Sequence, residues 1–228
     1  MSNLLQHIEL TTGPDPKGTV IWMHGLGADG WDFVPIVKEL DLPEDLALRF
    51  IFPHADVRPV TINNGYEMRA WYDISMNELQ RMPDERGIRA SQKQIEALLT
   101  REYDRGVASD KIVLAGFSQG GAIALQTGLR HGKPLAGILA LSTYLTLPES
   151  LAGEGAQANK SIPIFMAHGV EDPIVPLELA VQSRDALKSH GYNVRWVEYP
   201  MPHSVCMEEV VAIGEWLTDK FKSRILLA

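Results

Sequence analysis

Residues 112–121 constrain the fold of this chain more than any other segment, and they read IVLAGFSQGG. The segment opens with a short, partly β-branched apolar run, which is typical of a buried strand. A G-x-S-x-G motif follows, and the residues after it have a helix-forming composition. The pattern predicts a strand that turns sharply into a helix around Ser118, with a strained serine backbone and the hydroxyl at the tip of the turn. Gly116 and Gly120 are expected there because side chains at those positions would collide.

A glycine-rich turn between a strand and a helix can also arise by chance, or it can bind a phosphate group through its backbone amides. A phosphate loop of the common kind carries a lysine followed by serine or threonine, which residues 112–121 lack. The strand before the motif and the helix after it therefore favour a nucleophilic serine at position 118.

Segments with the patterns of strands and helices alternate along the rest of the chain. We expect strands at residues 7–12, 19–23, 48–52, 112–114, 135–141, 162–167 and 194–199. We expect helices at residues 33–40, 84–103, 177–188, from the serine to about residue 131, and near the C-terminus. The alternation predicts a single α/β domain over residues 1–228, with a doubly wound, mostly parallel sheet and helices on both faces.

Charge and cysteine content restrict the partners and the compartment. The formal net charge is −8, which disfavours nucleic acid and anionic membrane surfaces as main partners. Cys206 is the only cysteine, so an intrachain disulfide is excluded and secretion gains no support. The N-terminal residues lack the pattern of a secretion signal, and no apolar run reaches membrane-spanning length. We therefore expect a cytoplasmic protein without stable membrane association.

A glycine-dense loop follows the expected strand at residues 19–23. It occupies residues 24–30 and reads HGLGADG. A loop of this kind at the end of a strand exposes backbone N–H groups, which is how an oxyanion hole is built. A plain flexible turn is the alternative, and the histidine–glycine pair at the strand end favours the oxyanion loop.

The acid and the base that a nucleophilic serine needs are expected after later strands, since ligands bind at the carboxyl edge of an open α/β sheet. Asp172 lies in the loop after one expected strand, and His203 lies in the loop after the next. The order Ser, Asp, His along the chain is that of the α/β-hydrolases. A neutral imidazole can take the serine proton near pH 7, and a carboxylate fixes the imidazole tautomer. Ser118, Asp172 and His203 are therefore predicted to be the catalytic triad.

Other residues are also candidates for the acid and for the base. Glu171 adjoins Asp172, but Asp172 precedes Pro173, which restricts the turn. Three further histidines also follow expected strands, namely His24, His54 and His168. Any of them could bond loop backbone in a structural role, and we favour that role for the first and the third. His203 is preferred as the base because it follows both the serine and the acid.

Cys206 falls inside the expected last helix, so we interpret it as a small buried hydrophobe rather than a nucleophile. No histidine–acid cluster has the spacing of metal ligands, and neither a metal nor another cofactor is expected.

Residues 55–82 are the longest stretch without a clear helix or strand pattern. Loops of this length inside a compact domain are usually functional or disordered, and this one is too aromatic for disorder. One interpretation is an apolar substrate groove beside the active site. The other is that the same side chains pack onto the sheet. The residues concerned are Met68, Trp71, Met76, Leu79 and Met82.

Six segments carry a family resemblance that covers almost the whole chain: HGLGADG (24–30), FPHA (52–55), RPVTINNGYEMRAWYDI (58–74), GFSQGGAIAL (116–125), HGVEDPIVP (168–176) and HSVC (203–206). In these segments the chain resembles the phospholipase/carboxylesterase family of α/β-hydrolases, which includes the acyl-protein thioesterases. The resemblance implies the same triad, with the backbone N–H groups of Leu26 and Gln119 as the oxyanion hole. Bacterial-type members are broad esterases on short acyl esters, and others deacylate S-acylated proteins or lysophospholipids.

The leading functional hypothesis is a serine carboxylesterase that hydrolyses short- to medium-chain acyl esters through an acyl-enzyme. Acyl-protein thioesterase or lysophospholipase activity is the alternative within the family. The non-enzyme alternative is a receptor with a hydrolase fold that binds a small ligand, and an intact triad argues against it. A serine peptidase is disfavoured because the chain is too short for a second domain that would gate peptides. The expected partner is a small acyl ester or thioester, and a homodimer is left open.

Overall fold

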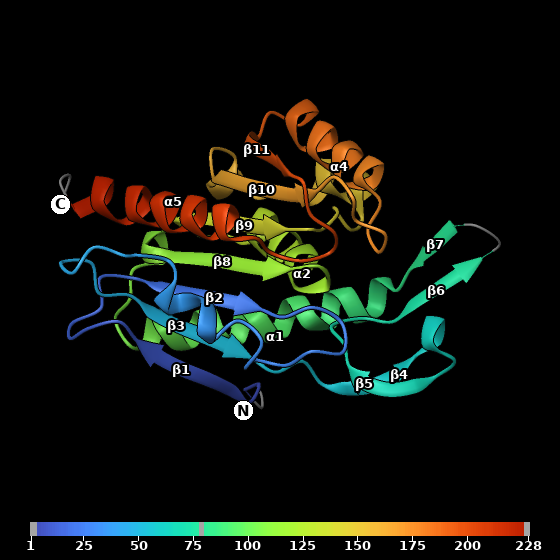
Figure 1. The fold of residues 1–228 in the computed structure, drawn as a ribbon, viewed down its shortest axis with the longest axis horizontal. Coiled ribbons are helices and arrows are strands. Elements are labelled where there is room, and N and C mark those ends of the chain that lie inside the picture. Colours follow the sequence, from blue (N-terminus) through green and yellow to red (C-terminus); the bar gives the residue numbers. More distant parts are fainter. Residues whose placement is uncertain (1–3, 78–79, 226–228) are drawn as a thin grey trace.

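Seven strands form one sheet in the computed structural model, which describes residues 4–77 and 80–225 (Figure 1). Their order across the sheet is β1 (His7–Thr11), β3 (Arg49–Pro53), β2 (Thr19–Met23), β8 (Ile112–Phe117), β9 (Gly137–Leu141), β10 (Pro163–Gly169) and β11 (Asn193–Tyr199). The pair β1–β3 is antiparallel, and the remaining neighbours are parallel. The predicted mostly parallel sheet is confirmed, with its antiparallel strand at the edge.

The central strands are mostly apolar because both faces of the sheet are covered. All five residues of β2 are buried. Ile21 and Met23 belong to one buried cluster, whereas Val20 and Trp22 belong to the cluster on the opposite face. This alternation follows from the two-residue period of a strand.

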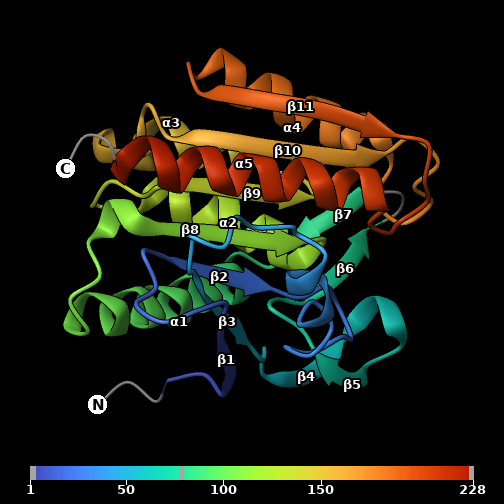
Figure 2. The same ribbon diagram turned by 60° about the vertical axis from the view of Figure 1, so that its left-hand side comes forward.

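Helices cover both faces of the sheet (Figure 2). The cluster on one face includes residues of α1 (Glu85–Asp104), α2 (Gln119–Arg130), α3 (Leu151–Glu154) and α4 (Leu177–Ser189). The other includes residues of α5 (Met207–Ile225) and of the 3-10 turn Pro35–Lys38. Further 3-10 turns lie at Thr61–Asn63, Ser109–Lys111, Pro148–Ser150 and Gln157–Asn159. Within the described residues, no helix combines the length and apolarity needed to span a bilayer.

The helix expected at residues 84–103 is confirmed together with its boundary signals. The side chain of Asp84 accepts a hydrogen bond from the amide of Gly87 and caps the first turn of α1. Gly106, with φ of 85°, adopts the left-handed conformation that ends the helix region. The helix expected at residues 33–40 is wrong in type, because only a single 3-10 turn forms there. Pro35 begins that turn, and Asp41 reverses the chain with φ of 47° soon after.

The expectation of an irregular stretch at residues 55–82 is wrong. This part of the chain forms two antiparallel hairpins, β4 (Val57–Val60) with β5 (Tyr66–Arg69) and β6 (Ile74–Asn77) with β7 (Gln80–Pro83). Asn64 and Gly65 both have positive φ in the first hairpin. An Asn-Gly pair is a strong hairpin signal, so this turn was recognisable in the sequence. Both hairpins project beyond the carboxyl ends of the parallel strands (Figure 1).

The last helix, α5, begins at Met207, one residue after Cys206. The expectation that this cysteine lies inside the helix is therefore wrong. The carbonyl of Cys206 accepts the amide of Val210, which places the cysteine at the N-terminal cap of α5. Its side chain is partly buried, and burial raises the pKa of the thiol. A thiol with a raised pKa is a poor nucleophile.

Candidate active site

Ser118 occupies the strained turn that its sequence context predicts. Its backbone has φ of 55° and ψ of −122°, between the end of β8 and the start of α2. The serine amide donates to the carbonyl of Leu141 at 2.9 Å, and the hydroxyl of Thr143 donates to the serine carbonyl at 2.6 Å. These bonds tie the turn to the end of β9, so the surrounding sheet holds the strained conformation in place.

The glycines of the motif are required by direct backbone contact. A Cβ atom on Gly116 would lie 2.2 Å from the carbonyl carbon of Gly120. A Cβ atom on Gly120 would lie 2.3 Å from the carbonyl oxygen of Met23 in β2. A Cβ atom on Gly121 would lie 2.8 Å from the carbonyl oxygen of Gly116. The turn therefore tolerates no side chain at these three positions, as the motif predicts for Gly116 and Gly120.

Three side chains from three loops form a continuous hydrogen-bonded row. His203 Nε2 lies 3.0 Å from Ser118 Oγ, and His203 Nδ1 lies 2.6 Å from Asp172 Oδ2. The other carboxylate oxygen, Asp172 Oδ1, accepts the amides of Ile174 and Val175 at 2.8 Å each. The structure thus brings together the serine, histidine and aspartate that the sequence predicts as a triad. In this geometry the imidazole can accept the serine proton while the carboxylate holds its second nitrogen.

The imidazole of His203 is also held by aromatic packing. Its ring centroid lies 4.7 Å from that of Phe117, the residue before the serine. Phe117 in turn packs against Phe33 at 5.6 Å.

Asp172 is buried, whereas its neighbour Glu171 is exposed. The buried carboxylate is therefore the one that faces the histidine.

The rival histidines bond to backbone. His24 Nδ1 donates to the carbonyl of Gly25 at 2.7 Å, and its Nε2 accepts the amide of Ala55 at 3.1 Å. Burial lowers the pKa of His24 to about 4, so the ring is neutral near pH 7. His54 Nδ1 accepts the amide of Gly30, and His168 Nε2 donates to the carbonyl of Val175. These contacts fit the structural role that the sequence favours for His24 and His168.

The backbone amides of Leu26 and Gln119, near the serine, have no hydrogen-bond acceptor within the described part of the chain. Gln119 is the first residue of α2, where a helix leaves its N–H groups free. The loop at residues 24–30 lies beside the serine, since a Cβ on Gly25 would be 3.5 Å from Ser118 Cβ. Free amides on both sides of a nucleophile are suited to bind a developing oxyanion.

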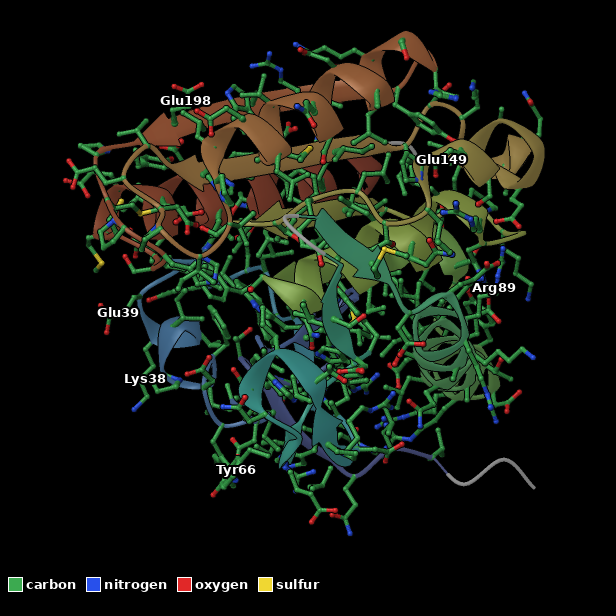
Figure 3. The ribbon with its side chains drawn as sticks, turned by 90° about the vertical axis from the view of Figure 1, so that its right-hand side faces the viewer. Lys38, Glu39, Tyr66, Arg89, Glu149 and Glu198 are labelled. Carbon is green, nitrogen blue, oxygen red and sulfur yellow. The ribbon has the colours of Figure 1, made fainter. Side chains whose placement is uncertain are left out.

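A pocket of about 230 Å³ lies at the carboxyl end of the sheet, the end that faces the viewer in Figure 3, and its lining does not include Ser118, Asp172 or His203. Its wall includes Tyr144, which directly follows Thr143, the partner of the serine carbonyl. Most of its other lining residues are apolar or aromatic: Tyr72, Ile74, Met82, Ile88, Leu145, Leu147, Pro148 and Leu179. Asp73, Thr146 and Glu149 complete the wall, and the labelled Glu149 in Figure 3 marks one side of this region.

The residues expected to form a substrate groove differ in where they lie and in how far they are buried. Met82 lines the pocket and is 46% exposed. Trp71 is fully buried, and its indole N–H donates to the carbonyl of His24, so the expectation that it lines a groove is wrong. Met68 is half-buried beside the loop at residues 24–30, with its sulfur 3.3 Å from Asn63 Nδ2, and it does not line the pocket. Leu79 lies outside the described residues.

The pocket residues that follow β9 are missing from the set predicted from the sequence. Tyr144 and Leu145 come just after the strand expected at residues 135–141. The rule that located Asp172 and His203, namely that ligands bind beyond the carboxyl ends of parallel strands, applies to this loop as well. Leu179 and Ile88 lie in the first turns of α4 and α1, and no local pattern separates them from other core-facing positions.

Proteins of known family match this chain over most of its length. The family model described as Phospholipase/Carboxylesterase matches residues 7–220. Acyl-protein thioesterase 1 of Neurospora crassa is 44% identical over 211 residues, which cover 89% of this chain and 86% of that protein. Acyl-protein thioesterase 1 of Cryptococcus neoformans is 34% identical over 241 residues, which cover 97% of this chain and all of that protein.

Solved structures show the same fold. SOBER1 of Arabidopsis thaliana superposes with a TM-score of 0.84 at 29% identity, covering 89% of this chain and 98% of that one. Acyl-protein thioesterase 2 of Zea mays superposes with a TM-score of 0.82 at 30% identity, covering 94% of this chain and 99% of that one.

Proposed function

The chain belongs to the phospholipase/carboxylesterase family, and on that basis we propose that it is a serine esterase that cleaves acyl esters or thioesters through an acyl-enzyme at Ser118. The observation that carries the proposal is the hydrogen-bonded row from Ser118 through His203 to Asp172. A row of this kind, at a strained turn beside two free amides, is an arrangement suited to acyl transfer.

Acylation of the enzyme follows from this geometry. Ser118 Oγ forms a bond to the carbonyl carbon of the substrate while His203 Nε2 takes the hydroxyl proton. The carbonyl π electrons move to the oxygen, and the amides of Leu26 and Gln119 donate to the resulting oxyanion. Collapse of the tetrahedral intermediate breaks the bond to the leaving oxygen or sulfur. The leaving group departs with the proton that His203 held.

Deacylation repeats the same steps with water as the nucleophile. His203 takes a proton from the water, and the water oxygen adds to the acyl carbon. Collapse breaks the bond to Ser118 Oγ, which recovers its proton from His203, and the carboxylic acid is released. Asp172 stabilises the imidazolium formed in each half-reaction, with its position fixed by the amides of Ile174 and Val175.

The pocket lined by Leu145, Leu179 and Met82 is proposed to hold the acyl chain. Tyr72 belongs to the same wall, and its carbonyl accepts the side-chain N–H of Gln119, the residue after the serine. The wall of the pocket is therefore hydrogen-bonded to the residue that follows the nucleophile. The mostly apolar lining of the pocket favours an alkyl chain over a charged acyl group.

A thioester of a protein cysteine is the second candidate substrate. It is favoured by the relatives named acyl-protein thioesterase 1, which match this chain over most of its length. The chemistry at Ser118 is the same for an oxygen ester and a thioester. The two candidates differ only in the leaving group.

Turnover of matched substrates tests the proposal. An octanoyl oxygen ester and an octanoyl thioester with otherwise identical leaving groups should both be hydrolysed, and a fluorophosphonate should label Ser118. The Ser118→Ala variant should lose turnover and labelling, whereas Ser204→Ala, next to His203, should keep both. Labelling without turnover of either substrate would instead support a small-ligand receptor on a hydrolase fold. The cytoplasmic location stays a prediction, to be checked by cell fractionation, and light scattering would determine whether the protein is a homodimer.

A further inference from the structure

Residues 69–72 connect the two amides of the proposed oxyanion hole, which belong to separate parts of the chain. Leu26 lies in the loop after β2, and Gln119 begins α2. The 69–72 segment runs from the last residue of β5 towards β6 and contains the buried Trp71. Its hydrogen bonds reach both sides of the oxyanion hole.

On the Leu26 side, the 69–72 segment makes two hydrogen bonds to the loop. The carbonyl of Arg69 accepts the amide of Gly27 at 2.9 Å, directly after Leu26. The indole N–H of Trp71 donates to the carbonyl of His24 at 2.9 Å, two residues before Leu26. The backbone on either side of Leu26 is therefore fixed, which orients the amide between these two points.

On the Gln119 side, the contact is a paired one. Gln119 Oε1 accepts the amide of Trp71 at 3.0 Å, and Gln119 Nε2 donates to the carbonyl of Tyr72 at 2.8 Å. The side chain of Gln119 is buried, and it bonds an N–H and a carbonyl of the segment at the same time. The residue that supplies one oxyanion amide is thus bound through its own side chain to the segment that holds the other.

The 69–72 segment is itself held rigidly. Ser91 of α1 donates its hydroxyl to the carbonyl of Trp71. The amide of Ala70 donates to the carbonyl of Asp56, and Arg69 Nη1 donates to the carbonyl of Ala55 at 2.8 Å. Ala70 and Trp71 are fully buried. A segment fixed in this way can set the distance between two amides that it bonds on opposite sides.

We propose that Gln119, through its side chain, and Trp71, through its indole N–H, are positioning residues that hold the amides of Leu26 and Gln119 at the separation an oxyanion requires. This inference rests on the proposed esterase function. Oxyanion stabilisation depends on donors that are already aligned before the charge develops. Loss of either contact should therefore weaken transition-state binding while leaving ground-state binding of the ester unchanged.

The test compares substrate kinetics with the affinity for an alkyl trifluoromethyl ketone, which forms an anionic tetrahedral adduct with the serine. Gln119→Met keeps the side-chain length and removes both hydrogen bonds. We expect kcat to fall roughly 10- to 100-fold with KM unchanged, and the ketone Ki to rise by the same factor. Trp71→Phe, which keeps the packing and removes only the indole N–H, should shift both quantities in the same direction by a smaller factor.

Gln126→Met is the matched control, because Gln126 is also a buried glutamine of α2 and bonds the side chains of Gln92 and Thr146. It should lower thermal stability as much as Gln119→Met does and leave the ketone Ki at the wild-type value.

Three results separate failure of this inference from failure of the proposed function. Wild-type ketone affinity in both Gln119→Met and Trp71→Phe, with an active wild-type enzyme, would overturn the positioning role alone. So would an equal rise in Ki for Gln126→Met. A wild-type protein with no turnover and no fluorophosphonate labelling would overturn the proposed function, and the inference with it.

Discussion

His168 Nε2 lies 3.4 Å from Asp172 Oδ2, in addition to its 2.9 Å contact with the carbonyl of Val175. The amide of Val175 donates in turn to Asp172 Oδ1. Both side chains are buried at the end of β10. His168 therefore holds the loop that orients the aspartate, whereas His203 is the histidine bonded to the serine.

Replacing the two histidines should separate these roles. His203→Ala should lower kcat by roughly 10³-fold or more, because the proposed base is lost. His168→Ala should lower kcat by only about 10-fold and should also lower the melting temperature, since it leaves a cavity and an unpaired carbonyl. Ester turnover and thermal unfolding of both variants provide the measurement. An equal loss of kcat in two folded variants would show that the base has been assigned wrongly.

The serine and the histidine should act as a unit. Ser118→Ala should lower kcat by roughly 10³-fold or more, and the double variant with His203→Ala should lose little beyond the single variants. The fold should persist in Ser118→Ala. Among the described residues, the Ser118 hydroxyl bonds only to His203 Nε2, so no hydrogen bond to the rest of the fold is lost. Single-turnover kinetics and circular dichroism measure the two effects. Losses that multiply in the double variant would argue against a shared proton transfer.

Local pattern was sufficient to locate the central part of the site. The turn at Ser118 was recognisable because its glycines and its strand–helix context are adjacent in the chain. Asp172 and His203 were located by one topological rule, that ligands bind beyond the carboxyl ends of parallel strands. That rule needs only the order of the strands.

The location of Trp71 could not be predicted from local sequence pattern or from strand order. A tryptophan in a segment without clear periodicity is equally consistent with a pocket wall and with the core. Its two decisive partners, His24 and Gln119, are far from it in the sequence. Only the folded arrangement of the hairpins beside the sheet brings these three residues together.

Glu209 should make stability depend on pH. Burial raises the pKa of this carboxyl from an ordinary value of 4.5 to about 8. Between about pH 5 and pH 8 the folded protein retains a proton that the unfolded chain has lost, so stability falls as pH rises through this window. Glu209→Gln keeps the shape and removes the ionisation. It should be more stable than wild type at pH 8 by on the order of a few kcal/mol, with the difference vanishing near pH 4.

Chemical denaturation at a series of pH values measures this effect. Tyr199 packs in the same region, and burial raises the pKa of its hydroxyl to about 12, so it stays neutral throughout the window. Glu215→Gln is the matched control, since Glu215 is exposed on the same helix. Parallel stability profiles for wild type and Glu209→Gln would contradict the prediction.

Acyl-chain length should distinguish a pocket wall from a surface residue at Met82. If the pocket holds the chain, each buried methylene contributes up to about 0.8 kcal/mol, or roughly a fourfold gain in kcat/KM. Efficiency should therefore rise from acetate towards octanoate esters and level off once the pocket is filled. Met82→Asp places a carboxylate against this lining and should reduce octanoate turnover roughly 10-fold while acetate turnover changes little.

Met207→Asp provides the control, because Met207 is also an exposed methionine, 52% accessible, but it begins α5 and does not line the pocket. It adds the same charge to the protein without touching the proposed acyl site. The ratio of kcat/KM for octanoate to that for acetate should therefore fall in Met82→Asp and stay at the wild-type value in Met207→Asp. An equal reduction for both esters in Met82→Asp would mean that the β6–β7 hairpin does not form the wall of the acyl site, because a lost pocket wall cannot penalise an acyl group too short to reach it.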